Sequence, residues 1–180
     1  MNMKILAENK TAICIFLILL AAATRLFPHP LNFTPMGAIG LFAGAYFYDR
    51  RVWLVPVIAL LVSDAVIGFY QPLVMLFVYL GFAVSVFIGS TLLYRTRTAF
   101  RLGVSAVVTA TVFFILSNMG VWLTGLYYPM TRAGLVECYI LALPFFGNTL
   151  LGDLFYVACL FGIVEMIQSW VNARSKLSTA

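Results

Sequence analysis

The stretch TRLFPHPLNFTPMGAIG, residues 24–40, separates two strongly apolar segments and decides how the chain must turn between them. It contains one arginine, the only histidine of the chain, one asparagine and three prolines. Proline lacks a backbone N–H and restricts the residue before it, so this stretch cannot continue a helix. We therefore expect a first helix to end near Arg25 and a second to begin near Gly37, joined by a stiff polar link.

The composition on both sides of this link is that of an integral membrane protein. Of the 180 residues, 63% are hydrophobic and 9% are charged, and the mean hydropathy is +1.04. A soluble domain carries about 25% charged residues and could not bury this much apolar surface in so small a core. The chain is therefore expected to be an all-α membrane protein with a single transmembrane domain over residues 1–180 and lipid as its main solvent.

Turn residues and charges divide the chain into six apolar segments, each expected to be a transmembrane helix. We expect the first to be a retained span and not a cleaved signal peptide, because similar apolar segments follow it without pause. The last contains Pro144 and is long enough for a lead-in segment followed by a full span over residues 144–170. The expected segments are residues 12–27, 35–48, 52–70, 72–94, 101–125 and 139–170.

The positive charges indicate the orientation. With a cytoplasmic N-terminus, all of the 11 Lys and Arg residues except Arg25 and Arg132 fall on the inner side. This asymmetry follows the positive-inside rule, and six spans then place both termini in the cytoplasm. The same distribution accounts for the net charge of +5 without a nucleic-acid partner.

Polar residues of four expected spans and of the first link lie toward the outer side. The inner halves of the same spans are almost wholly apolar, which favours an outward-facing pocket with a closed bottom over a pore or a proton relay. Amides and carboxylates would bind a solute by hydrogen bonds, Arg25 would pair with an anionic group or with Asp64, and Trp122 would offer a stacking face. The expected lining residues are Arg25, His29, Asn32, Asp64, Asn118, Trp122, Asn148 and Asp153.

Several of these residues have a purely structural alternative. Asp64 and Asp153 could be structural carboxylates, protonated or paired with Arg25. His29 could be a solvated link residue, and Trp122 could belong to the aromatic belt that anchors many membrane proteins at the interface.

The chain also contains closely spaced glycines and three cysteines. Gly40 and Gly44 have the GxxxG spacing that lets helices approach closely, either inside the protein or against another membrane protein. The three cysteines lack metal-ligand spacing and are expected to be buried small residues. A lone histidine cannot form a metal site without neighbours, so no metal and no other cofactor is expected.

Four strings of the chain resemble a family of uncharacterised bacterial transport proteins, related to the S components of energy-coupling factor (ECF) vitamin transporters. The strings are RLFPHPLNFTPMGAIGLFAGAYF, LLVSDAVIGF, FFILSNMGVWL and YYPMTRAGLVECYILALPFFGNTLLGDL. The resemblance implies a six-helix S-component-like bundle in the bacterial inner membrane, a substrate-binding protein for uptake of a vitamin or related micronutrient. It also implies an ECF coupling subunit and ATPases as partners. Many S components carry AxxxA on the first helix, whereas Ala21, Ala22 and Ala23 are consecutive here, so a solitary protein is the alternative.

Motifs typical of enzymes are absent from the chain: it has no HExxH, GxSxG, Walker sequence or Gly-rich phosphate loop. We therefore expect a binding protein and no enzyme. Two alternatives stay open: an intramembrane enzyme with Asp64 and Asp153 as an acid/base pair, and an assembly subunit whose polar cluster only holds helices together.

Overall fold

The computed structural model describes residues 9–47 and 50–178, and these are arranged in helices and the links between them, with no strand. The expected all-α class is therefore confirmed for the described part of the chain. Lys4 and residue 48, the end of the second expected segment, lie outside it. The helices are α2 (Lys10–Leu26), α3 (Met36–Tyr46), the 3-10 turn η1 (Arg50–Trp53), α4 (Leu54–Ile67), α5 (Pro72–Leu92), α6 (Ala99–Leu123) and α7 (Arg132–Ser178).

Three of the described helices are long and apolar enough to cross a membrane: α5, α6 and the Arg132–Arg174 part of α7. Such helices indicate a membrane protein, as the composition predicts. The other helices are shorter, with 17 residues in α2, 11 in α3 and 14 in α4. A helix of about 20 residues is needed for the full hydrocarbon thickness, so six complete spans stay a prediction.

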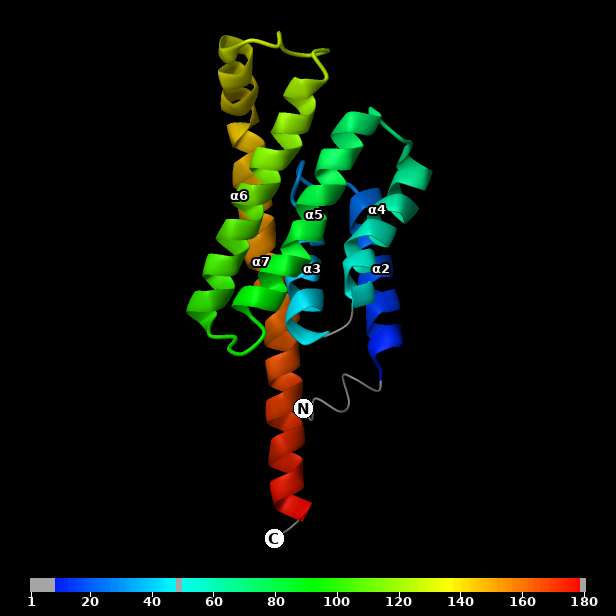
Figure 1. Cartoon of the computed structure of the whole chain (residues 1–180). Helices are drawn as coiled ribbons and strands as arrows, with labels where there is room; N and C mark the ends of the chain where they lie inside the picture. Colours follow the sequence, from blue (N-terminus) through cyan, green and yellow to red (C-terminus); the bar gives the residue numbers. More distant parts are fainter. Residues whose placement is uncertain (1–8, 48–49, 179–180) are drawn as a thin grey trace.

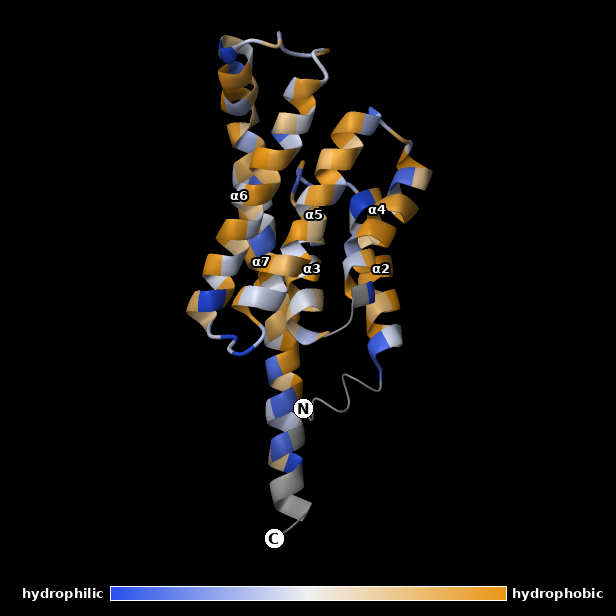
Figure 2. Ribbon diagram, viewed as in Figure 1, coloured by the Kyte–Doolittle hydropathy of each residue, from blue (hydrophilic) through white to orange (hydrophobic). Residues whose placement is uncertain are grey.

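Successive helices run in alternating directions, and the start of α2 and the end of α7 lie at the same end of the bundle (Figure 1). Apolar residues cover the helices, while hydrophilic residues gather at helix ends, in links and in the C-terminal part of α7 (Figure 2). The sequence predicts a lead-in segment before Pro144 that continues as a full span after it. In the structure both parts belong to one helix of 47 residues that runs through Pro144.

The short helix α3 forms the centre of the molecule. Every residue from Met36 to Ala45 is buried, which fits a helix that is apolar or small on all sides. A Cβ atom added to Gly40 would overlap the Ser85 hydroxyl, and one on Gly44 would overlap the Val86 carbonyl. The GxxxG spacing therefore serves close packing of α3 on α5 inside the protein, the internal one of the two alternatives.

The other helices pack around this centre in two groups. α2 packs mainly on α4, whereas α6 contacts both α5 and α7. Phe82 on α5 stacks on Phe113 of α6 with ring centroids 4.3 Å apart, and Phe42 on α3 meets Phe161 of α7 edge to face at 5.3 Å. The first of these contacts holds α5 against α6, and the second holds α3 against α7.

Candidate functional site

The link between α2 and α3 does not lie at the outer edge of the bundle. Figure 1 shows it well below the upper ends of α6 and α7, so the chain turns partway along the bundle. Asn32 adopts a φ of 65°, a left-handed conformation that asparagine tolerates better than most residues. Backbone bonds from Phe33 N–H to Pro30 O (3.0 Å) and from Thr34 N–H to Asn32 O (3.1 Å) close the turn.

Contacts with α7 hold this link in place. The Nδ2 group of Asn148 donates to the carbonyl of Leu31 at 3.0 Å, and the ring of Phe33 lies 5.7 Å from that of Tyr156. A Cβ on Gly152 would lie only 3.2 Å from the Cα of Phe33, so glycine permits the close approach of the link to α7. Asn148 is thus a residue that positions the link, and its amide is committed to the backbone.

A buried ion pair joins the ends of α2 and α4. Arg25 Nη2 lies 2.8 Å from Asp64 Oδ1, Arg25 Nη1 donates to the Ser63 hydroxyl, and Tyr79 on α5 donates to Asp64 Oδ2 at 2.8 Å. Asp64 is therefore partnered at both oxygens, as the structural alternative for this carboxylate supposes. In the adjacent α4–α5 link, partial burial and the Asp64 charge raise the pKa of Tyr70 to about 12, against a smaller opposing effect of Arg25. The Tyr70 phenol is neutral at physiological pH and adds no charge.

The second buried carboxylate, Asp153 on α7, lies at the start of α3. It is 2% exposed, and the backbone N–H of Ala38 donates to it. A Cβ on Gly37 would overlap the carboxylate, so glycine there allows the approach. The first N–H groups of a helix lack intrahelical partners and carry partial positive charge, which suits a carboxylate. The other oxygen, Asp153 Oδ2, is buried and has no hydrogen-bond partner.

Two adjoining hollows lie beside Asp153. The first, which we call the polar lobe, measures about 70 Å³ and is lined by residues that include Arg25, Asn32, Thr34, Thr149 and Asp153. The second, the aromatic lobe, measures about 190 Å³ and is lined by Phe113, Phe114, Phe145 and Phe146 together with Ser117 and Asn118. Both lobes are lined by Asn32, Phe113 and Thr149, so they share a wall, and we call them together the two-lobed cavity.

Of the eight residues predicted from the sequence, the structure brings some together at this cavity and leaves others elsewhere. Arg25 and Asp153 line the polar lobe, Asn118 lines the aromatic lobe and Asn32 lines both. Asp64 and Asn148 line neither lobe, but Asp64 binds Arg25, which does, and Asn148 holds the α2–α3 link by its bond to Leu31.

Two predicted residues lie apart from the cavity. His29 is exposed, and its Nδ1 lies 2.7 Å from the carbonyl oxygen of Phe27, which accepts the hydrogen bond. Trp122 donates from Nε1 to the carbonyl of Pro129 at 3.2 Å, in the link that joins α6 to α7. Neither side chain lines a lobe. Their bonds are local, so the structural alternatives describe both residues better than a binding role does.

The sequence interpretation missed Thr149 and the phenylalanines of the aromatic lobe. Thr149 and Asp153 are four residues apart on α7, and residues 142, 145 and 146 precede them at helical spacing, so they share one face. That periodicity was available in the sequence. A phenylalanine in an apolar helix, however, gives the same sequence pattern whether its side chain faces lipid, the protein core or a cavity.

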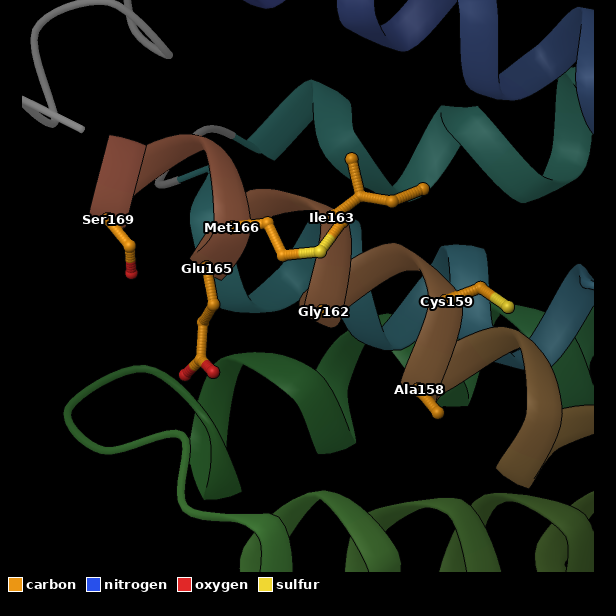
Figure 3. Close-up of a pocket in the computed structure, with 7 residues that line it drawn as sticks. All are labelled: Ala158, Cys159, Gly162, Ile163, Glu165, Met166 and Ser169. Atoms are coloured by element: carbon orange, nitrogen blue, oxygen red, sulfur yellow. The ribbon is translucent and has the colours of Figure 1, made fainter. Parts of the chain in front are cut away.

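A larger hollow lies elsewhere, on the C-terminal half of α7, with a volume of about 630 Å³ (Figure 3). All of its lining residues belong to α7, and Glu165 is the only charged one. The side chains of Cys159, Ile163 and Glu165 point in different directions in Figure 3, so they do not converge on a common point. This open groove lacks the convergent polar groups of a binding site. No group of three His, Cys, Asp or Glu side chains that could hold a metal ion occurs among the described residues.

Comparison with known proteins identifies a family to which the chain is similar. A family model described as "Family of unknown function (DUF6580)" matches residues 6–175 of the chain. No curated protein sequence and no solved structure matches the chain. The matched region includes α2 to α6 and most of α7, so every residue of the two-lobed cavity lies within it.

Proposed function

The chain belongs to this family of unknown function, and from its geometry we propose that it is a membrane-embedded protein that binds a small solute for uptake. The observation that carries the proposal is the two-lobed cavity, where side chains from α2, the α2–α3 link, α6 and α7 meet inside an otherwise apolar bundle. Burying polar groups at such depth costs free energy unless they have partners or a functional role. A bound solute would be the partner of those polar groups that no protein group pairs.

In this proposal the bundle of six α-helices lies in the bacterial inner membrane and both termini lie in the cytoplasm. The alternating helix directions in Figure 1 support this topology. The segments that carry most Lys and Arg, namely the start of α2, η1, the α5–α6 link and the end of α7, lie at one end of the bundle, which the positive-inside rule assigns to the cytoplasm. The α2–α3 link lies on the opposite side of α3 from that end.

The shape of α3 also supports a transport role. With 11 residues it is about 16 Å long, so its N-terminus lies inside the bundle and not at an interface. Discontinuous helices whose termini lie near the membrane midplane commonly form the binding sites of transporters. Asn32 lines both lobes and is also exposed, which provides access to the cavity beside the link.

We further propose that the protein acts in the manner of an ECF S component and captures a vitamin or related micronutrient. Support comes from the sequence resemblance and from the small helical chain that lacks a nucleotide-binding motif. Delivery would then require a coupling subunit with ATPases, or the protein would act alone. An enzyme with Asp64 and Asp153 as an acid/base pair is less well supported, because both oxygens of Asp64 are held by Arg25 and Tyr79.

The proposal is tested by native mass spectrometry of the protein purified from its own host in mild detergent. We expect a small-molecule adduct on the wild-type chain and its loss in Ala142→Leu, because the added carbon atoms fill the aromatic lobe that Ala142 lines. Ala158→Leu is the matched control, since Ala158 lies on the same helix, away from the two-lobed cavity and exposed.

Two outcomes would contradict the proposal. An adduct that persists in Ala142→Leu would place the solute outside the two-lobed cavity. A wild-type protein that carries no adduct and co-purifies in fixed stoichiometry with another membrane protein would favour the assembly subunit instead.

A further inference from the structure

We propose that the two-lobed cavity takes a compact organic cation, in which a nitrogen that bears an N–H binds Asp153 and one ring occupies the aromatic lobe. This inference rests on the proposed function, because it names the class of solute for the same cavity. It is carried by three features of the cavity: an unpartnered carboxyl oxygen, the lack of a cationic partner for this carboxyl among the described residues, and the size of the aromatic lobe.

The unpartnered oxygen is Asp153 Oδ2. The side chain is 2% exposed and lines the polar lobe, and the Ala38 N–H is the protein donor that reaches the carboxylate. One carboxylate contact suffices to cap α3, whereas Oδ2 is buried without any partner. A buried acceptor without a hydrogen bond is rare and costly, and it calls for an occupant that donates one.

The charges around the polar lobe favour a positive occupant. Arg25 is held by Asp64 and Ser63, so its charge is already compensated. Asp153 has no cationic side chain as a partner among the described residues, so a solute that brings a positive charge can hold its carboxylate in the ionised form. An anionic solute would meet this carboxylate at close range, whereas an ammonium N–H would form a charge-assisted bond to it.

Aromatic side chains at the polar lobe support the same choice. Phe82 and Phe113 stack with ring centroids 4.3 Å apart, and both line the polar lobe. The faces of aromatic rings attract cations, most strongly where water is excluded. The polar lobe thus combines one carboxylate oxygen with apolar aromatic walls.

The aromatic lobe limits the size of the solute. An apolar cavity of about 150 Å³ holds one benzene ring, so the lobe of about 190 Å³ accommodates a single ring and not a fused pair with substituents. Four of its eight apolar lining residues are phenylalanines, and Asn118 and Ser117 add polar groups from α6. Asn118 donates from Nδ2 to Phe114 O at 2.8 Å, which fixes the orientation of its amide at the wall.

The test uses three probes of one shape and different charge: benzylammonium, benzyl alcohol and benzoate. Their binding to the full-length protein, freed of co-purified solute and placed in lipid nanodiscs at neutral pH, is measured by isothermal titration calorimetry. We expect benzylammonium to bind at least about tenfold more tightly than benzyl alcohol, because both can donate a hydrogen bond to Asp153 but only the ammonium pairs its charge with the carboxylate. Benzoate should not bind measurably.

Asp153→Asn should remove this preference for the cation while benzyl alcohol keeps its affinity. Glu165→Gln is the matched control, because Glu165 is an exposed carboxylate on the same helix and lies outside the two-lobed cavity, so it should change neither affinity. Benzyl alcohol or benzoate binding as tightly as benzylammonium would overturn the inference, and so would an unchanged benzylammonium affinity in Asp153→Asn. These outcomes leave the proposed solute uptake standing, which the adduct experiment with Ala142→Leu decides separately.

Discussion

Asp64 and Asp153 are both buried carboxylates on apolar helices, 1% and 2% exposed, yet their surroundings differ. Asp64 is held by Arg25 from α2 and Tyr79 from α5, so it ties three helices together. Asp153 accepts a backbone N–H from Ala38 and has one oxygen without a partner. One carboxylate is thus neutralised by the fold, whereas the other has an oxygen without a protein partner, for which we propose a solute.

The largest expected effect is a difference in the free energy of unfolding between variants of the two carboxylates. Asp64→Asn should lower the free energy of unfolding by about 3 kcal/mol, because Arg25, only 18% exposed, loses its counter-ion. Asp153→Asn should change it by less than about 1 kcal/mol, since the amide oxygen can still accept from Ala38 and the unpartnered charge is gone. Unfolding by denaturant titration in detergent measures both. Equal losses would contradict the distinction between the two carboxylates.

A double variant provides the control for this comparison. Arg25→Met combined with Asp64→Leu removes both charges, so it should be more stable than Asp64→Asn alone. If the double variant is the less stable of the two, the loss in Asp64→Asn does not come from an orphaned Arg25 charge.

A smaller effect is expected from Tyr79→Phe, which deletes the donor to Asp64 Oδ2. The free energy of unfolding should fall by about 1.5 kcal/mol, which is the lower end of the usual range for a hydrogen bond to a charged group. The same change in an Asp64→Asn background should cost less, because the charge that strengthens the bond is absent. A cost that is the same in both backgrounds would show that Tyr79 acts through packing and not through Asp64.

The smallest effect concerns the link that brings Arg25 toward Asp64 and Asn32 toward Asp153. Asn32→Ala should lower the free energy of unfolding by about 1 kcal/mol, because alanine is strained at a φ of 65°. Asn32→Gly should cost less, since glycine adopts this conformation freely. Thermal unfolding of the two variants in one detergent separates them. If glycine is as destabilising as alanine, the Asn32 side chain, and not its backbone conformation, stabilises the link.

Much of this architecture could be predicted from the residues themselves. The low share of charged residues indicates helices in lipid, the prolines at 28, 30 and 35 end the first helix, and the convergence of polar residues on one side indicates a pocket. The pairing of Arg25 with Asp64 was one of the predicted alternatives, because a buried carboxylate needs a cation or a proton. The internal use of the glycines at 40 and 44 was another.

Other features were decided by packing between segments distant in the sequence. Asp153 reaches the start of α3 only because Gly37 lacks a Cβ. Thr149 and Phe113 line both lobes because the rotation of α7 and α6 about their axes turns these side chains toward the cavity. His29, rare and placed beside the polar turn, lies outside the cavity.

The sequence by itself therefore determined the solvent of the helices, their approximate ends and the side on which polar groups gather. These properties follow from composition and from the chemistry of single residues along one helix. Only the tertiary structure decided which carboxylate has partners and which is left with an unpartnered oxygen. The physical reason is that partnership depends on the rotation and depth of each helix, which the close contacts of α3 with α5 and α7 set together.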